Sequence, residues 1–339
     1  MNSLERNLLA LQLKEADRVP VAPAILTRAI RVAGVKQIAY HTDPAVLAGA
    51  QVLHCERYDF DGVYISSDNV IMYEALGGRI VFPDEDSYPF WTDPLLENSR
   101  GLARLAVPDP GCAGRMPMVI EAARLAMEQV GRRRFVLANI DSGPFQLAST
   151  LMGMDRAMAL LLDAQEEMTK ILAFCAEVAM AYGRGMAGSG CHGIQFGEST
   201  AGLLGRELYE TQVWPHDCRL VRELQRTGVK VFLHVCGDSS RILDLMADTG
   251  ADCLEIDSQV DMTWAKRTVG GKVALKGNVN TSSFIDKSTE ELYDECRQIT
   301  LAGKPGGGFI LSAGCETPAA AGDDAVRAIR RAADAFGTY

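Results

Sequence analysis

Residues 230–238 read KVFLHVCGD, a short run of apolar and β-branched residues that ends in polar side chains and a glycine. Similar runs occupy residues 18–26, 62–68, 135–144, 193–199, 253–260, 272–279 and 308–317. After residue 130, stretches with apolar residues at three- and four-residue spacing separate these runs, which indicates alternating strands and helices. This alternation is typical of parallel βα units, and eight strands are the number that closes a (β/α)8 TIM barrel.

The competing architecture for such an α/β chain is a doubly wound open sheet. No G-x-G-x-x-G motif follows the first expected strand, which favours the barrel. We expect a helix before Arg18 to cap the amino-terminal end of the barrel. Residues 69–130 are long for one connection, so we expect an insertion between the second and third strands, over the barrel mouth. Residues 1–339 would then form a single domain.

The composition predicts a soluble cytoplasmic protein. The net charge is −10, and the longest basic block is three arginines, so neither a nucleic-acid partner nor a membrane surface is expected. No apolar run approaches the roughly 18 residues of a membrane span, and the amino terminus lacks the plan of a secretory signal. The 9 cysteines are odd in number and never form C-x-x-C, which favours reduced thiols.

In a barrel, functional side chains gather at the carboxyl-terminal ends of the strands. His234 and Cys236 are two residues apart, so on a strand both side chains leave the same face. Cys315 follows the last expected strand, in the small-residue context SAGCETP. One imidazole and two thiolates suit Zn²⁺ and leave a fourth position open for catalysis. The alternative is that H-x-C occurs by chance and that these cysteines are ordinary core residues.

Several motifs together carry a resemblance to a known family. They are LKEADRVPV (13–21), VPDP (107–110), LHVCGD (233–238), LEIDSQVD (254–261), ALKGNVN (274–280) and GGFILSAGCETP (307–318). In this order and spacing the chain resembles the uroporphyrinogen decarboxylase superfamily over nearly its whole length, which implies a (β/α)8 barrel. The pattern His234, Cys236 and Cys315 resembles that of the corrinoid-dependent methyltransferase branch, which implies zinc at these three residues.

The resemblance also implies the reaction and its partners. Members of that branch move a methyl group to or from a corrinoid, here a methylcobamide. This chain has no D-x-H-x-x-G element, so a separate corrinoid-binding protein should supply it. The small molecule at the zinc would be a thiol, tetrahydrofolate or a methoxy compound. Tyr88, Phe90 and Trp91 could stack on an aromatic substrate or could equally pack the insertion onto the barrel.

Other polar residues at the expected strand ends are further candidates for the site. Glu198 closes an apolar run and is a candidate for a displaceable fourth ligand or a proton acceptor, and Asp257 for a group that orients the metal site or the substrate. The alternative for Asp257 is a hydrogen bond to a neighbouring strand. The candidate substrate-binding residues are Arg28, Ser66, Asn139 and Asp141.

Two other functions compete with methyl transfer. A metal-free decarboxylase of the uroporphyrinogen type would carry an early R-Q-A-G-R loop that binds substrate carboxylates. The corresponding stretch here reads LTRAIRVAG (26–34), which has Arg28 and Arg31 but not that motif. A non-catalytic barrel that only binds a partner protein is disfavoured, because an open site with two thiolates and an imidazole would then have no use.

Overall fold

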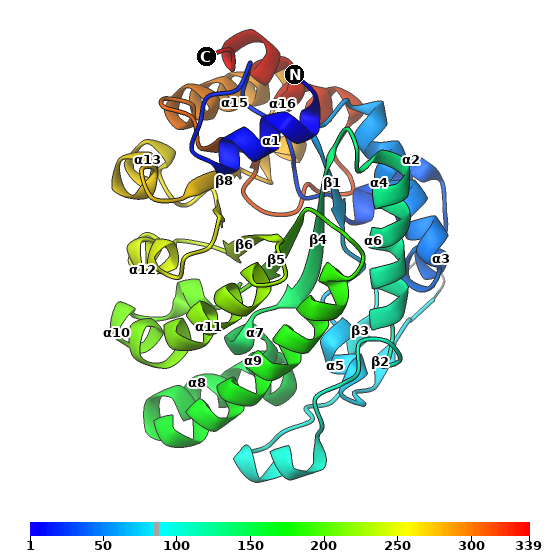
Figure 1. Cartoon of the computed structure of the whole chain (residues 1–339), viewed down its shortest axis with the longest axis vertical. Helices are drawn as coiled ribbons and strands as arrows, with labels where there is room; N and C mark the ends of the chain where they lie inside the picture. The colour runs from blue at the N-terminus through cyan, green and yellow to red at the C-terminus, as the bar shows by residue number, and fades with distance from the viewer. Residues whose placement is uncertain (85–87) are drawn as a thin grey trace.

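The computed structural model describes residues 1–84 and 88–339 and contains a curled parallel sheet surrounded by helices (Figure 1). Residues 85–87, which belong to the expected insertion, lie outside the described residues. The sheet has the order β1-β4-β5-β6-β7-β8-β9. Its strands are β1 (Gly62–Ile65), β4 (Phe135–Ser142), β5 (Gly193–Gly197), β6 (Lys230–Val235), β7 (Cys253–Ile256), β8 (Ala274–Val279) and β9 (Phe309–Ala313). Seven of the eight expected strands are therefore present.

The strand expected at residues 18–26 is not a regular strand, and this prediction is wrong. Val21 forms only an isolated parallel bridge with Leu311 of β9. Pro20 has no N–H to donate to a neighbouring strand, although its carbonyl accepts from the Leu311 amide at 2.9 Å. On the other side, the Asp61 amide donates to the Val21 carbonyl at 2.7 Å. The segment thus bonds to both edges of the sheet without the continuous pairing of a strand.

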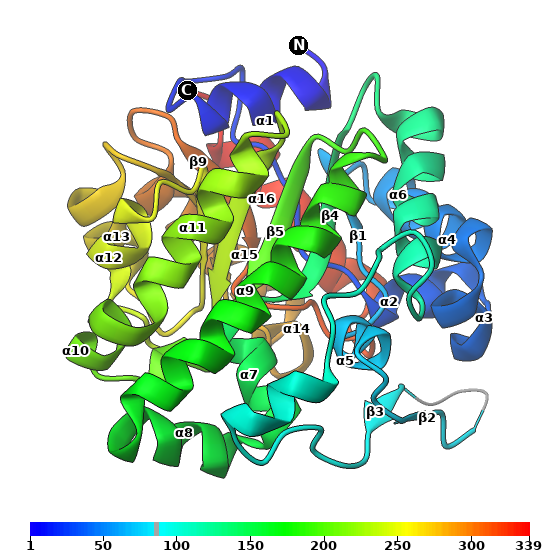
Figure 2. The same ribbon diagram turned by 60° about the horizontal axis from the view of Figure 1, so that its bottom comes forward.

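The helices lie outside the sheet (Figures 1 and 2). The first half of the chain contains α1 (Ser3–Leu11), α2 (Thr27–Ala33), α3 (Gln37–Thr42), α4 (Pro44–Arg57), α5 (Ile71–Ala75), α6 (Met116–Val130), α7 (Pro144–Met152) and α8 (Met154–Asp163). The second half contains α9 (Gln165–Ala187), α10 (Arg206–Leu208), α11 (Trp214–Gln225), α12 (Leu243–Asp248), α13 (Met262–Val269), α14 (Ser283–Asp286), α15 (Thr289–Gly303) and α16 (Asp323–Phe336). Over residues 1–84 and 88–339, no helix is long and apolar enough to cross a bilayer.

The stretch between β1 and β4 contains several short elements before α6. They are α5, the hairpin of β2 (Ile80–Val81) and β3 (Phe90–Trp91), and the 3-10 helix η1 (Ser99–Arg104). Figure 2 shows the hairpin beside α5, at the end of the molecule opposite both termini. In contrast, α6 packs against β1 and β4 and serves as the crossover helix between these parallel strands.

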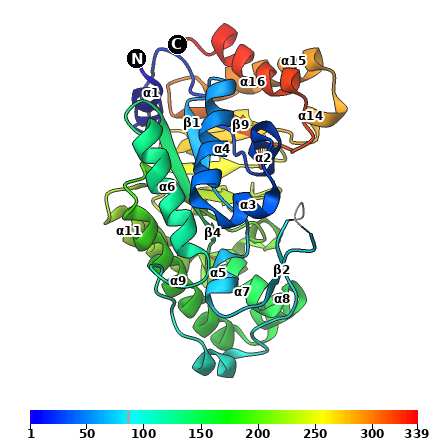
Figure 3. The same cartoon turned by 90° about the vertical axis from the view of Figure 1, so that its right-hand side faces the viewer.

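The amino-terminal end of the curled sheet is filled by apolar side chains. Phe135 and Phe232 point inward there, with ring centroids 5.9 Å apart, and pack with other buried residues of the same layer. Leu4 and Leu8 of α1 pack against this layer from outside. Figure 3 shows α1 at this end, close to both termini. Because α1 and the apolar layer occupy this end, the polar side chains that line the pocket lie toward the other end of the strands.

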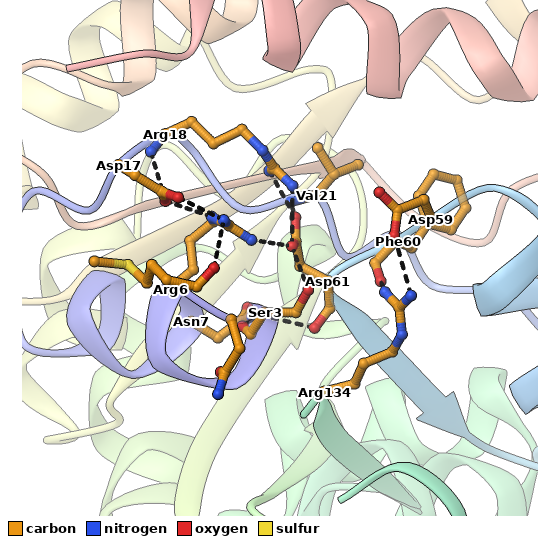
Figure 4. Close-up of polar contacts among 12 residues, drawn as sticks. Ser3, Arg6, Asn7, Asp17, Arg18, Val21, Asp59, Phe60, Asp61 and Arg134 are labelled. Atoms are coloured by element: carbon orange, nitrogen blue, oxygen red, sulfur yellow. Dashed lines mark hydrogen bonds and ion pairs between the residues drawn. The ribbon is translucent and has the colours of Figure 1, made fainter. Parts of the chain in front are cut away.

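Asp61, immediately before β1, anchors α1 and the 18–26 segment (Figure 4). Its buried carboxylate accepts from Arg6 Nη1 at 2.6 Å and from Arg18 Nη1 at 2.7 Å. The Ser3 hydroxyl and the Val21 amide also donate to it, each at 2.8 Å. One carboxylate therefore joins three segments at the amino-terminal end of the sheet.

Candidate metal centre

The ends of β6 and β9 bring His234, Cys236 and Cys315 together. Their ligand atoms all lie within 4.8 Å of one another. The His234 Nε2 is 3.1 Å from the Cys236 Sγ, and the two sulfur atoms are 3.9 Å apart. The two-residue spacing puts His234 and Cys236 on one side of the chain, whereas Cys315 reaches them from a strand that is distant in the sequence.

Glu255 sets the orientation of the histidine ring. Glu255 of β7 is the register partner of His234 of β6, and the Glu255 carbonyl oxygen lies 3.2 Å from the His234 Nδ1. A donor at Nδ1 leaves Nε2 without a proton, and Nε2 is the nitrogen that faces Cys236. This is how metal-binding histidines are held in proteins, because the second nitrogen fixes the tautomer.

The two thiols are coupled through their mutual contact. A hydrogen bond with Cys315 lowers the pKa of Cys236 to about 7, although burial of the Cys236 thiol acts in the opposite direction. The same hydrogen bond, together with burial, raises the pKa of Cys315. One thiolate is thus accessible near neutral pH even without a cation. A soft, borderline cation such as Zn²⁺ fits these donors, since thiolate and imidazole are its preferred ligands.

A pocket of about 170 Å³ opens beside the cluster. Its lining comes from the 18–26 segment, from the ends of β1, β4, β5, β6, β7 and β9, and from the segments that follow these strands. The lining residues are Ala24, Leu26, Tyr64, Asn69, Asn139, Asp141, Ser142, Gln146, Gln195, Gly197, Ser199, His234, Cys236, Glu255, Ala313, Gly314, Cys315 and Glu316. A small molecule in this pocket would touch the candidate metal ligands directly.

The structure brings some of the candidate substrate-binding residues to the pocket. Asn139 and Asp141 line it, and Ser66 lies behind Asn139, whose Nδ2 donates to the Ser66 hydroxyl at 3.1 Å. Arg28 is not brought there. Its guanidinium is buried against Asp323 at 2.9 Å and the Tyr58 hydroxyl at 2.7 Å, so it ties α2 to α16.

Asp141 has an unusual backbone conformation for a residue other than glycine. Its φ is +74°, and the pairing of β4 with β5 shifts register between Asn139 and Ser142. Burial, and then the nearby Asp68 carboxylate, raise the pKa of Asp141 well above its usual range. A carboxyl group carried by a strained backbone at a β-bulge beside a pocket is typical of a functional position.

Glu198 is not among the lining residues, and the structure does not bring its carboxylate to the metal cluster. The Glu198 oxygens accept from the amides of Phe145 and Gln146, each at 2.8 Å, at the amino terminus of α7. Its own amide donates to the His234 carbonyl at 2.8 Å. These contacts favour a role in positioning α7 and the end of β6.

Glu198 shares a buried site with Asp217 of α11. The Tyr209 hydroxyl donates to Asp217 at 2.9 Å. Burial raises the pKa of both carboxyl groups, that of Asp217 to about 7. The pair therefore holds a proton in the folded protein at pH values where the unfolded chain has lost it.

This proton predicts a specific pH dependence of stability. Since the pKa of Asp217 is raised on folding, its contribution is complete below about pH 4 and is lost as pH rises toward 7. As pH rises from about 4 to 7, the unfolding free energy of the Asp217→Asn variant should fall less than that of the parent protein. The difference should be up to about 1.4 kcal/mol per pH unit. Chemical denaturation at several pH values measures this, and parallel curves for both proteins would contradict it.

Asp257 lies next to the metal cluster without lining the pocket. Its Oδ2 accepts from the Gly237 amide at 3.0 Å, and its Oδ1 accepts from the Ser258 hydroxyl at 3.0 Å. Gly237 has a φ of +74° and follows Cys236 directly. Asp257 thereby holds the turn that fixes the direction of the Cys236 side chain.

Removing this support is expected to weaken metal binding without unfolding the protein. Groups that orient metal ligands typically change affinity about 10- to 100-fold, and we expect a loss in that range for Asp257→Ala. Zinc titration against a competing chelator measures the affinity. Asp261→Ala is the matched control, because Asp261 caps α13 in the same loop. An equal effect of both substitutions would contradict the proposed support.

Several residues that line the pocket were not predicted from the sequence. Gln195 occupies the inward position of β5 between Gly193 and Gly197, so strict alternation could have identified it. Gln146 had no such signal, because it reaches the pocket from the start of α7 rather than from a strand end. The Ser199 hydroxyl, which contacts Cys236, follows β5 in an irregular segment.

The fold and the cluster together define an α/β protein with a curled parallel sheet and a potential metal site at one end of its strands. The family model described as Uroporphyrinogen decarboxylase (URO-D) matches residues 2–336. The chain belongs to this family, and the resemblance drawn from its motifs is confirmed.

The named relatives include both methyltransferases and decarboxylases. The chain is 25% identical over 316 residues to methylcobamide:CoM methyltransferase MtbA of Methanosarcina acetivorans, covering 92% of this chain and 91% of the relative. It is also 25% identical over 327 residues to uroporphyrinogen decarboxylase of Saccharophagus degradans, covering 91% and 90%. A solved methyltransferase structure from Methanosarcina mazei has the same fold, with a TM-score of 0.90, 22% identity and 99% coverage of both chains.

Proposed function

We propose that this protein is a zinc-dependent methyltransferase that moves a methyl group between a corrinoid on a partner protein and a small molecule in the pocket. The observation that carries the proposal is the convergence of His234, Cys236 and Cys315 within 4.8 Å at the pocket wall. Relatives named methylcobamide:CoM methyltransferase support it. Bound zinc would act as a Lewis acid that lowers the pKa of a thiol or polarises an oxygen at its open position.

The chain's own residues prepare this chemistry. The Glu255 carbonyl keeps the lone pair of His234 Nε2 on the side of the two sulfurs. The contact between Cys236 and Cys315 makes the first thiol proton easy to remove. Asn139 and Asp141 lie on the pocket wall, where they can orient the small molecule. Three protein donors leave room for that molecule, and this is typical of catalytic zinc sites.

We also infer that described residues between β1 and the hairpin, with Asn69 among them, help to cover the small molecule. Asn69 lines the pocket, and the ring of Tyr88 packs edge-on against His41 with centroids 5.2 Å apart. The pocket would then be the mouth of a barrel in which the 18–26 segment takes the eighth position. The corrinoid protein is expected to approach this same end of the sheet, because the cluster faces the pocket there.

The visible spectrum of a methylated corrinoid protein tests the proposed function. Mixing it with the zinc-loaded protein and a methyl acceptor should convert the methyl–cobalt spectrum to that of the demethylated corrinoid. Thiols and tetrahydrofolate are tested as acceptors with the methylated corrinoid protein, and methoxy compounds are tested as donors with the demethylated, reduced corrinoid protein. An unchanged spectrum with every candidate would contradict methyl transfer.

A metal-free decarboxylase is the second candidate, because a relative with that name matches at the same identity. Its substrate carries several carboxylates, which need basic side chains around them. Among the described residues that line the pocket there is no lysine or arginine, and Arg28 is held by Asp323 elsewhere. The pocket therefore favours methyl transfer. Turnover of uroporphyrinogen by the purified protein would decide for the decarboxylase.

A further inference from the structure

The pocket wall is rich in acidic side chains. Asp141, Glu255 and Glu316 line it, and no lysine or arginine does among the described residues. Lys276 is buried, and its ammonium group is paired with the Glu255 carboxylate. Lys276 lines a separate cavity with Tyr64 toward the amino-terminal end. It therefore stabilises Glu255 from below and is not presented to a molecule in the pocket.

Two amide oxygens at the pocket have no hydrogen-bond donor among the described residues. They are the Oε1 atoms of Gln195 and Gln146. The Gln195 Nε2 donates to the Glu255 carboxylate, which fixes the orientation of this amide and leaves its oxygen as the free acceptor. Gln195 is only 4% exposed. A buried acceptor without a partner is costly, so these oxygens call for donors from a ligand.

Glu316 also lines this pocket and is held in place. Its Oε1 accepts from the Thr27 amide at 3.0 Å and from the Thr27 hydroxyl at 2.7 Å. Both contacts use one oxygen, so they fix the carboxylate while the other oxygen takes no part in them. The wall thus combines the fixed Glu316 carboxylate with two unpaired amide oxygens, and these three groups are acceptors.

We propose that the pocket selects a neutral or cationic small molecule that presents N–H or O–H donors, and that it rejects an anionic group such as a sulfonate or carboxylate. The inference rests on the proposed function and narrows its substrate class. An anion here would face the Glu316 carboxylate, and among the described residues no lysine or arginine lines the pocket to offset the charge repulsion. A donor group would instead satisfy Gln195 and Gln146.

Three small thiols that differ in the charge of their tail test this inference. Cysteamine is cationic, mercaptoethanol is neutral and mercaptoethanesulfonate is anionic. Titration calorimetry with the zinc-loaded protein should give Kd values at least about 10-fold lower for the first two than for the sulfonate. Equal or tighter binding of the sulfonate would overturn the proposal. Saturation-transfer NMR with ethanolamine and isethionate repeats the comparison on metal-free protein.

A charge-removing variant links the selectivity to the wall. Glu316→Gln should narrow the difference between the neutral and anionic thiols at least about 3-fold. Glu97→Gln is the matched control, since Glu97 is exposed and does not line the pocket, and it should leave the difference unchanged. Identical selectivity in both variants would overturn the role of Glu316. The rank order of the thiols is measured by binding and does not depend on methyl transfer. An absence of methyl transfer would therefore contradict the proposed function but not this inference.

Discussion

Cys315→Ser is expected to lose zinc and methyl-transfer activity together. The three donors His234, Cys236 and Cys315 lie within 4.8 Å, so removing one sulfur leaves two protein ligands for the cation. Changes to groups that merely orient ligands reduce affinity or activity about 10- to 100-fold, and loss of a ligand itself should exceed about 100-fold. Metal analysis after dialysis measures the zinc content, and the corrinoid spectrum measures the activity.

Cys112→Ser is the matched control for this experiment. Cys112 is also a free cysteine, but it is exposed and is not part of the cluster. We expect the control to keep one equivalent of zinc and full activity. A Cys315→Ser protein that retains both would contradict the metal assignment, and circular dichroism excludes unfolding as the cause of a loss.

Asp61→Asn is expected to cause a large loss of unfolding free energy. The Asp61 carboxylate is fully buried and binds Arg6 and Arg18 (Figure 4). Removing one partner of a buried ion pair leaves uncompensated charge and costs about 3–5 kcal/mol. The loss should appear in chemical denaturation at neutral pH. Asp59→Asn is the matched control, because Asp59 pairs with Arg134 and Arg330 at the exposed surface and should cost less than about 1 kcal/mol.

The effect of Asp61 should also depend on pH. Burial alone would raise the pKa of Asp61, but the hydrogen bond and charge of Arg18 outweigh it and lower the pKa below the ordinary 3.8. A lowered pKa means that the stabilisation is present above about pH 4 and is lost as pH falls through the folded-state value. The stability difference between parent and variant should therefore shrink under strongly acidic conditions. A constant difference would contradict the ion-pair explanation.

The sequence was sufficient to predict the strands that consist of continuous apolar runs. Such runs are buried on both faces, as the runs at 135–142 and 274–279 are almost throughout, so their composition differs clearly from that of the helices. The 18–26 run misled because its apolar residues are buried as in a strand while Pro20 prevents regular pairing. Burial and strand pairing are separate properties, and hydrophobicity reports only the first.

The sequence by itself determined the family, the parallel α/β fold and the candidate metal ligands, because spacing along a strand dictates which side chains share a face. Only the tertiary structure decided which polar strand ends meet. Glu198 and Arg28 turn to the helices α7 and α16, whereas Gln146 and Gln195 enter the pocket. The physical reason is that a buried polar group takes whichever partner the packing of distant segments supplies, and no local pattern encodes that choice.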